Sequence, residues 1–259
     1  MKRICLVFAA ALLSFLVADA RTVKKTYDID DFTGIRITNA FEVVLEHSDT
    51  YKVEIEISEE FLPFLLVKNR GGILELNFTK LPFDLKQKNR TKDVRAVISM
   101  PELTFIEMSG ASQLICNDQF SNAMDKISID LSGGSLIKNL NLKSPEVVIE
   151  LSGASKATMS VRAGDVDVNL KGSSRLVMDG EASELDIKAT GSSRVNGAGF
   201  VAEDAEVNAS GASSVEIGVT RVLTAEISGG SKCRYHGDED NLTVKAEKIS
   251  GASSLKHVK

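Results

Sequence analysis

Apolar and polar residues alternate strictly on both sides of a glycine that recurs eight times in the second half of the chain. The residues two and four places before this glycine are almost all apolar, and the residue between them is polar in every copy. An apolar residue returns four places after the glycine. A period of two puts successive side chains on opposite faces of a strand, whereas a helix needs a period of about 3.6. Each glycine is therefore expected to join two half-buried strands.

The residues around each glycine are small, and successive glycines are 23, 20, 19, 19, 20, 18 and 22 residues apart. Glycine tolerates a positive φ and has no Cβ that could clash with a neighbouring coil. A repeat of about 20 residues that always restarts in the same phase is what one turn of a parallel β-solenoid needs. The eight corners are Ser109-Gly110-Ala111-Ser112, Ser132-Gly133-Gly134-Ser135, Ser152-Gly153-Ala154-Ser155, Lys171-Gly172-Ser173-Ser174, Thr190-Gly191-Ser192-Ser193, Ser210-Gly211-Ala212-Ser213, Ser228-Gly229-Gly230-Ser231 and Ser250-Gly251-Ala252-Ser253.

The pattern thus predicts an all-β fold, a parallel β-helix-like solenoid with about 20 residues per coil over residues 101–259. At strand spacing, the eight corners would span roughly 34 Å. A sandwich built from hairpins would bury alternate residues too, and it stays an alternative. Glu247 is the one polar residue in the inward column four places before the glycine, which predicts that the last coil is distorted or uses a shifted register.

Residues 21–100 keep the strand alternation but lack the serine corner. Strands are expected to begin near residues 35, 53, 73 and 94, again about 20 residues apart, and most of the aromatic residues lie in this half. We interpret the segment as an N-terminal β segment that supplies the first coils or a cap of the same solenoid. A separate domain is the alternative. The polar stretch from Pro82 to Asp93 is expected to be an exposed loop.

The first 20 residues have the composition of a signal peptide. Lys2 and Arg3 precede an apolar run from Ile4 to Val17, and Ala18-Asp19-Ala20 matches a signal-peptidase site. The apolar run is shorter than the roughly 20 residues of a bilayer-spanning helix. We expect cleavage after Ala20, no membrane span afterwards, and a location in the periplasm, on the outer cell surface or in the medium.

Net charge, cysteines and histidines limit the partners, disulfides and metal sites that can be expected. The formal net charge of the 259-residue chain is −5, which favours neither nucleic acid nor anionic lipid. Cys116 and Cys233 would lie about six coils apart, near 29 Å, so they cannot form a disulfide within one chain. The three histidines are scattered singly, so no metal set and no cofactor is predicted.

Three features together resemble a known family: the Phe32-Thr33-Gly34-Ile35 opening, the Phe41-Glu42-Val43-Val44-Leu45 strand, and the serine-glycine corners. The chain resembles the exported Bacteroidetes proteins classed as putative auto-transporter adhesins with a head GIN domain, a domain of unknown function. The resemblance covers nearly all of the chain after residue 20. It implies a right-handed parallel β-helix-like fold and an adhesive role.

One outward column is a candidate ligand-contact strip. Glu107, Asp130 and Glu150 occupy the polar position three places before successive glycines, so a solenoid would stack their carboxylates. Such a strip could contact a cation or a sugar. The alternative is a solvated sheet face with ordinary charge scatter, and the column lacks an aromatic platform for a sugar ring.

These observations favour an exported, non-catalytic binding module of the cell envelope or surface, with a glycan or an envelope or host-surface protein as its partner. No catalytic residues are predicted. Two alternatives follow from single features. The chain could assemble structurally through its uncovered terminal coil, or it could act on polysaccharide through the Glu107, Asp130 and Glu150 strip.

Overall fold

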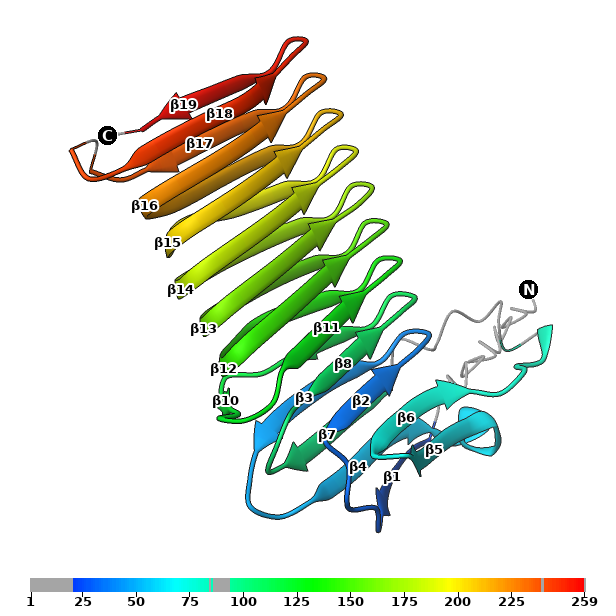
Figure 1. Cartoon of the computed structure of the whole chain (residues 1–259). Helices are drawn as coiled ribbons and strands as arrows, with labels where there is room; N and C mark the ends of the chain where they lie inside the picture. The colour runs from blue at the N-terminus through cyan, green and yellow to red at the C-terminus, as the bar shows by residue number, and fades with distance from the viewer. Residues whose placement is uncertain (1–20, 84, 86–93, 239, 259) are drawn as a thin grey trace, which may run out of the picture.

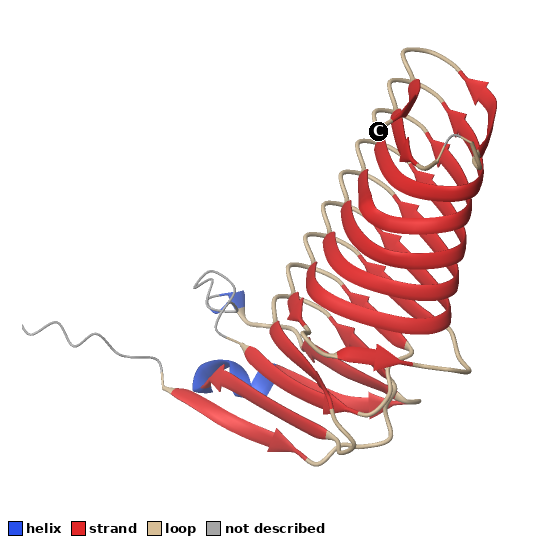
Figure 2. Ribbon diagram, turned by 90° about the vertical axis from the view of Figure 1, so that its left-hand side faces the viewer, coloured by secondary structure: helices blue, strands red, loops and turns tan. Residues whose placement is uncertain are grey.

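The computed structural model describes residues 21–83, 85, 94–238 and 240–258. They wind into a β-solenoid of about 8 turns with roughly 20 residues per turn. The coils stack as bands along one axis, and the corners form a row along one edge (Figures 1 and 2). In the described residues, every strand pair from Phe105 onward is parallel. The predicted parallel solenoid is confirmed, and the hairpin sandwich is excluded.

Nineteen strands join one sheet within the described residues. The N-terminal part comprises β1 (Thr22–Tyr27), β2 (Gly34–Ile37), β3 (Glu42–His47), β4 (Lys52–Ser58), the 3-10 helix η1 (Glu59–Phe64), β5 (Leu65–Arg70), β6 (Ile73–Phe78) and β7 (Arg95–Met100). The repeat part comprises β8 (Phe105–Met108), β9 (Gln113–Ile115), β10 (Gln119–Ser121), β11 (Ile127–Leu131), β12 (Leu136–Leu151), β13 (Lys156–Leu170), β14 (Arg175–Ala189), β15 (Arg194–Ala209), β16 (Ser214–Ile227), β17 (Lys232–His236), β18 (Thr243–Ile249) and β19 (Ser254–His257).

Strands β12 to β16 each run from one corner to the next and curve on the way (Figure 2). The solenoid therefore has two outer faces that meet at the row of corners. We call the outer surface of the segments that lead into corners, such as 146–151 and 165–170, the approach face. The outer surface of the segments that leave corners, such as 156–160 and 175–179, is the exit face.

The corner glycines all have a left-handed backbone, with φ between 69° and 83°. From Gly134 to Ala252, the N–H after each glycine donates to the carbonyl oxygen of the glycine in the preceding coil, at 2.7 Å in every step. This contact leaves no room for a side chain: a Cβ on Gly172 would lie 2.8 Å from the oxygen of Gly153. The corner thus requires glycine for its φ and for its close approach.

The fourth residue of each corner turns inward although it is a serine. The Ser155 hydroxyl lies 2.8 Å from the carbonyl oxygen of Ser152 and 3.2 Å from that of Leu131 in the preceding coil. The hydroxyl therefore satisfies carbonyl groups that the sharp corner leaves at the edge of the core. The buried corner serines are Ser112, Ser135, Ser155, Ser174, Ser193, Ser213 and Ser231.

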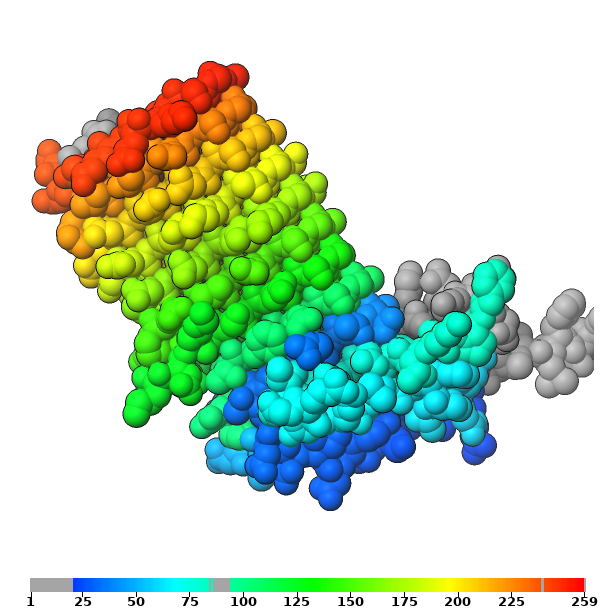
Figure 3. Space-filling model, turned by 45° about the vertical axis from the view of Figure 1, so that its right-hand side comes forward, coloured from blue at the N-terminus to red at the C-terminus, as the bar shows by residue number. Residues whose placement is uncertain are grey.

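The N-terminal part contributes to the same core, but not in chain order. β2 pairs with β6 on one side and β8 on the other, and β3 lies in the same way between β7 and β9. The segments near residues 35, 73 and 94 thus enter parallel coils. The segment near residue 53 differs from the regular spacing, because β4 runs antiparallel to both β1 and β7. These strands close one end of the stack (Figure 3).

The row of corners begins earlier than the glycine repeat. Asn39, between β2 and β3, has a φ of 80°, and its carbonyl oxygen accepts the N–H of Ala111 at 2.7 Å. Asparagine is among the few residues that adopt this conformation at modest cost. At the other end, the register between β16 and β18 shifts after Ala225–Ala246, so Glu247 has no partner across the ladder. The irregular last coil predicted from Glu247 is confirmed, and it takes the form of a register shift.

Two sequence expectations concern segments that the structure does not describe. The signal segment, residues 1–20, lies outside the described residues, as does most of the predicted loop from Pro82 to Asp93. In the part that is described, no helix has the length and apolar character needed to cross a membrane.

The corner geometry predicts opposite outcomes for two glycines. Gly172→Ala forces alanine to a φ of 75° and places its Cβ against the backbone of Gly153, so we expect a loss of about 2 kcal/mol or more. In Gly134→Ala, the new Cβ meets its nearest atom at 3.6 Å, so we expect stability to hold or to rise by about 0.4–1 kcal/mol. Guanidinium unfolding midpoints compare the two; equal losses would contradict this role of the corner.

Candidate binding faces

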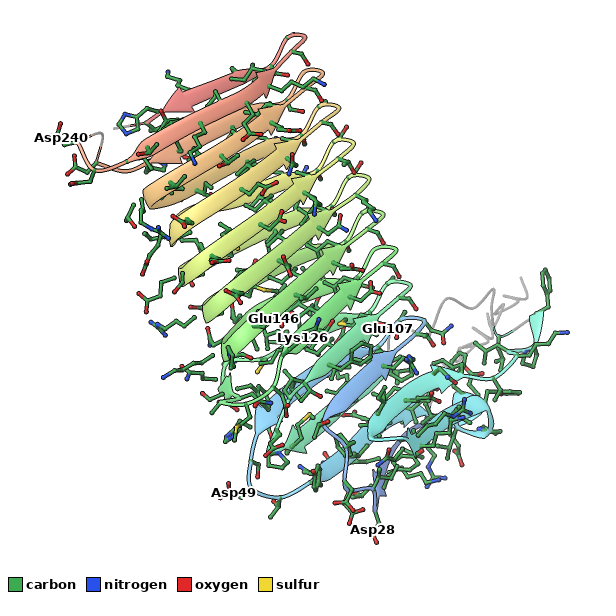
Figure 4. All side chains as sticks on the ribbon, in the orientation of Figure 1. Asp28, Asp49, Glu107, Lys126, Glu146 and Asp240 are labelled. Atoms are coloured by element: carbon green, nitrogen blue, oxygen red, sulfur yellow. The ribbon has the colours of Figure 1, made fainter. Side chains whose placement is uncertain are left out.

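The predicted acidic strip lies on the approach face. Asp130 on β11 pairs in register with Glu107 on β8 and with Glu150 on β12, so the three carboxylates stack on successive coils. Below them, Arg36 on β2 pairs with Glu107 in the ladder, and its Nε lies 2.7 Å from a Glu107 carboxylate oxygen. Figure 4 labels Glu107 on β8. Arg36 therefore neutralises one end of the strip.

The ionisation of Asp130 is affected by this stacking. Burial raises the pKa of the Asp130 carboxyl, and the charges of Glu150 and Glu107 raise it further. At the lower end of the column, Glu75 has the opposite balance. Burial works to raise the pKa of Glu75, but hydrogen bonds and charges from Lys68, Arg70 and Arg36 outweigh it, and the pKa is lowered. In this column, neighbouring cations thus compensate the charge of Glu75, whereas Asp130 is repelled by the carboxylates on both sides of it.

The approach face is more acidic than the strip alone. Between β12 and β15, two further outward columns are almost entirely acidic, and their registers place the carboxylates directly above one another. Only part of this charge is paired: Lys126 Nζ lies 3.2 Å from a Glu146 carboxylate oxygen. Figure 4 labels both residues. The additional stacked acids are Glu146, Asp165, Glu184 and Asp204 in one column and Asp167, Asp186 and Glu206 in the next.

The exit face has the opposite sign. From β13 to β19, its first outward column after the corners carries four exposed cations and its second column two, against a single carboxylate in the two columns together. Sequence reasoning missed this surface because it followed the polar column before the glycine and not the columns after it. The first column is Leu136, Lys156, Arg175, Arg194, Ser214, Lys232 and Ser254, and the second is Thr158, Val177, Asn196, Glu216, Arg234 and Lys256.

An apolar groove lies near the N-terminal end of the exit face. Val44 on β3 pairs with Val97 on β7 and with Ile115 on β9, so three apolar side chains adjoin one another on the outer surface. Val44 is 41% exposed. The groove has a volume of about 330 Å³, and Glu42 and Arg95 are among the charged residues that line it. The outward apolar column interrupts the polar pattern of this face.

The cysteines are structural. Cys116 and Cys233 are both buried and free, so the prediction that they do not form a disulfide with each other is confirmed. Burial raises the pKa of the Cys116 thiol to about 11 and that of Cys233 to about 12. Both thiols are therefore protonated and unreactive at neutral pH. Among the described residues, no group of three His, Cys, Asp or Glu side chains is arranged to hold a metal ion.

Residues 31–238 match a family model described as putative auto-transporter adhesin, head GIN domain. This chain belongs to that family. The resemblance found from the opening, the β3 strand and the corners is thus confirmed. No curated protein sequence matches the chain.

Solved structures of Bacteroidetes proteins share the fold of this family member. A putative adhesin from Parabacteroides merdae ATCC 43184 has a TM-score of 0.83 at 19% identity, over 93% of this chain and 98% of that chain. A putative adhesin and a putative lipid binding protein, both from Parabacteroides distasonis ATCC 8503, have a TM-score of 0.82 over the same shares, at 17% and 18% identity. Likeness at such identities establishes the fold and leaves function to the site.

The like-charge stack predicts a pH-dependent gain of stability in Asp130→Asn. Because the pKa of Asp130 is raised in the folded protein, the native state binds more protons than the unfolded chain, and stability falls as pH rises through the carboxyl range. We therefore expect Asp130→Asn to be more stable than wild type at pH 7, by roughly 0.5 kcal/mol. The gain should disappear by about pH 3, where the carboxyl is protonated in both states.

Thermal unfolding at pH 3 and pH 7 measures this difference. Asn169→Asp is the matched control, because it adds a carboxylate next to Glu150 in the same column. It should lower stability at pH 7 and have little effect at pH 3. An Asp130→Asn variant that is less stable than wild type at pH 7 would refute the repulsion.

Proposed function

We propose that the chain is an exported, non-catalytic binding module of the cell envelope or cell surface, which contacts a glycan or an envelope or host-surface protein through its outer faces. The observation that carries this proposal is the in-register stacking of charged side chains on a rigid scaffold. Membership of a family described as putative auto-transporter adhesins supports it.

The geometry suits binding at many points. A single exposed ion pair contributes about 0–1 kcal/mol, so one column residue could not hold a partner. Stacked coils repeat the same group about every 4.8 Å along the axis, which lets a repetitive ligand make the same contact several times. Since hydrogen-bonded strands fix the backbone of each column, little conformational entropy is lost when the ligand binds. The repeat thus allows several weak contacts with one ligand to add up to a higher total affinity.

The proposal places the chain outside the cytoplasm, in keeping with the signal segment expected at residues 1–20. Access to an external partner requires exposure on the cell surface. Protease or antibody accessibility on intact cells, compared with lysed cells, tests that part. Protection on intact cells would confine the partner to the periplasm and eliminate adhesion to other surfaces.

We predict that the mature chain binds a component of a glycan array, a host-matrix panel or an envelope extract, and that the acidic strip contributes to the contact. The triple variant Glu107→Gln, Asp130→Asn, Glu150→Gln should weaken that binding about tenfold, which corresponds to 1.4 kcal/mol. Its control is Asp28→Asn, Asp49→Asn, Asp240→Asn, which removes the same charge from exposed positions far from the strip (Figure 4).

Affinity measured by biolayer interferometry separates the outcomes. The control triple should stay within about twofold of wild type, since screened charges at a distance contribute little. Equal losses in both triples would show a general charge effect and remove the strip from the contact. No binding to any of the three panels would refute the proposed function.

The terminal coil favours a second function, structural assembly. β18 is exposed along its whole length, and among the described residues it pairs with β16 alone. Ile249 is 44% exposed and Val244 is 37% exposed. Uncovered solenoid ends and strand edges are surfaces that template further pairing. A second copy could therefore stack on this coil.

This alternative predicts self-association that depends on concentration. Sedimentation velocity should show larger species as concentration rises, and Ile249→Lys should shift the distribution to monomer because it places a charge on the uncovered end. Val177→Lys is the control, since Val177 is exposed to nearly the same degree, 43%, but lies in mid-stack on the exit face. A strict monomer at millimolar concentration would eliminate assembly through this coil.

A further inference from the structure

The four cations of the first exit-face column form a ladder: Lys156, Arg175, Arg194 and Lys232. Ladder pairing places Lys156 beside Arg175 and Arg175 beside Arg194, and Ser214 stands between Arg194 and Lys232. Over four steps of strand spacing the ladder is about 19 Å long. All four side chains are exposed. We call these four residues the basic ladder.

The basic ladder is not neutralised within the protein. Among the described residues, no carboxylate lies within ion-pair distance of any of its four side chains. Like charges that face each other on neighbouring strands repel and destabilise the sheet. The stacked cations do not follow from an overall excess of positive charge, because the chain carries a formal charge of −5. An anionic ligand would relieve their repulsion.

A hollow interrupts the ladder where the column residue is small. It has a volume of about 580 Å³, and Arg194, Ser214 and Lys232 of the column line it together with Asn196. Of the ten lining residues, three are cations and one is a carboxylate, so the hollow has an excess of two positive charges. The hydroxyl and amide groups offer hydrogen bonds to a neutral polar ligand group at the same place.

The one carboxylate of the hollow is already occupied. Glu216 forms an ion pair with Arg234, and His236 Nε2 lies 3.1 Å from its other oxygen. Burial works to raise the pKa of Glu216, but the hydrogen bonds from His236 and Arg234 outweigh it, and the pKa is lowered. Glu216 therefore stays ionised and turned toward its own partners, which leaves Arg194 and Lys232 available to an incoming anion.

We propose that the basic ladder binds a linear anionic polysaccharide along the solenoid axis, with one anionic sugar unit seated in the hollow at Ser214. The inference deepens the proposed binding function and rests on it. Sugar carboxylates or sulfates contact Arg175, Arg194 and Lys232 in turn, while ring hydroxyls meet Ser214 and Asn196. The ligand lies across the coils, so each coil from Lys156 to Lys232 contributes one cation, except the coil that carries Ser214.

The ladder favours a polysaccharide over a nucleic acid. Proteins that bind single strands stack the bases on aromatic side chains, and neither outward column of the exit face contains an aromatic residue. The coil spacing of about 4.8 Å is comparable to the length of one pyranose unit, so charges on an extended sugar chain can fall in step with the coils. The contact is then mostly ionic, and it needs no aromatic platform.

The test measures binding of fluorescent dextran sulfate to the mature chain, with neutral dextran as the uncharged comparison. Wild type should bind dextran sulfate and not dextran. Its dissociation constant should rise on the order of tenfold between 50 and 200 mM NaCl, because several counterions are released together. Lys156→Gln, Arg175→Gln, Arg194→Gln, Lys232→Gln should weaken binding by at least tenfold.

The control for this quadruple variant removes four cations from other surfaces: Lys126→Gln, Lys188→Gln, Arg221→Gln, Lys245→Gln. It should bind within about threefold of wild type, which shows that position and not net charge decides. Circular dichroism verifies that each variant is folded. Should the quadruple variant not fold, Ser214→Glu replaces it, with Thr224→Glu on the approach side of the same strand as its partner. Ser214→Glu should lose binding, and Thr224→Glu should keep it.

The outcomes distinguish this inference from the proposed function. If the ladder variants bind dextran sulfate as well as wild type does, the ladder assignment is wrong. If wild type binds no polyanion but captures another ligand on the panels, the inference fails and the binding module stands. Tighter binding to polyuridylate than to dextran sulfate would replace the sugar chain with a nucleic acid. No ligand on any panel would refute both.

Discussion

The hydrogen bond between successive corners is the constraint on which the rest of the solenoid depends. The carbonyl oxygen of each corner glycine from Gly110 to Gly229 accepts the next corner's N–H at 2.7 Å. The glycine of that next corner must have a positive φ and no Cβ for this contact to form. The polar backbone groups of the corners are therefore already engaged in hydrogen bonds between coils. What recognises a partner has to be supplied by the outer faces.

In-register stacking follows directly from the fixed corners. When each coil restarts at the same point, residues at equal distance from the glycine lie above one another, and a column becomes a property of the sequence position. Inward columns are restricted to apolar side chains and the buried serine. Outward columns are not restricted in this way, so their charges can be placed without cost to the core, apart from the repulsion between like neighbours.

The repeated half of the fold could be predicted from the sequence because its signal is local: glycine, alternation and spacing recur together. The stacking of Glu107, Asp130 and Glu150 and the irregularity at Glu247 followed from the same alignment. The order of the strands in the N-terminal part could not be predicted from the sequence. Alternation shows that residues 52–58 form a strand, but it does not show in which direction this strand runs or with which strand it pairs. The corner at Asn39 was missed because asparagine replaces glycine there. The basic ladder could have been found in the sequence, because each of its cations lies three residues after a corner glycine. The negative net charge of the chain drew attention away from it.

Segregation of charge between the two faces is not required by the fold. In the three outward columns of the approach face between β12 and β15, eight carboxylates stand against one cation. In the first two outward columns of the exit face, counted from β13 to β19, six cations stand against one carboxylate. A surface that serves only solubility carries both signs interspersed, since mixed neighbours attract and like neighbours repel. Stacks of like charge on both faces therefore point to partners that supply the missing counter-charge.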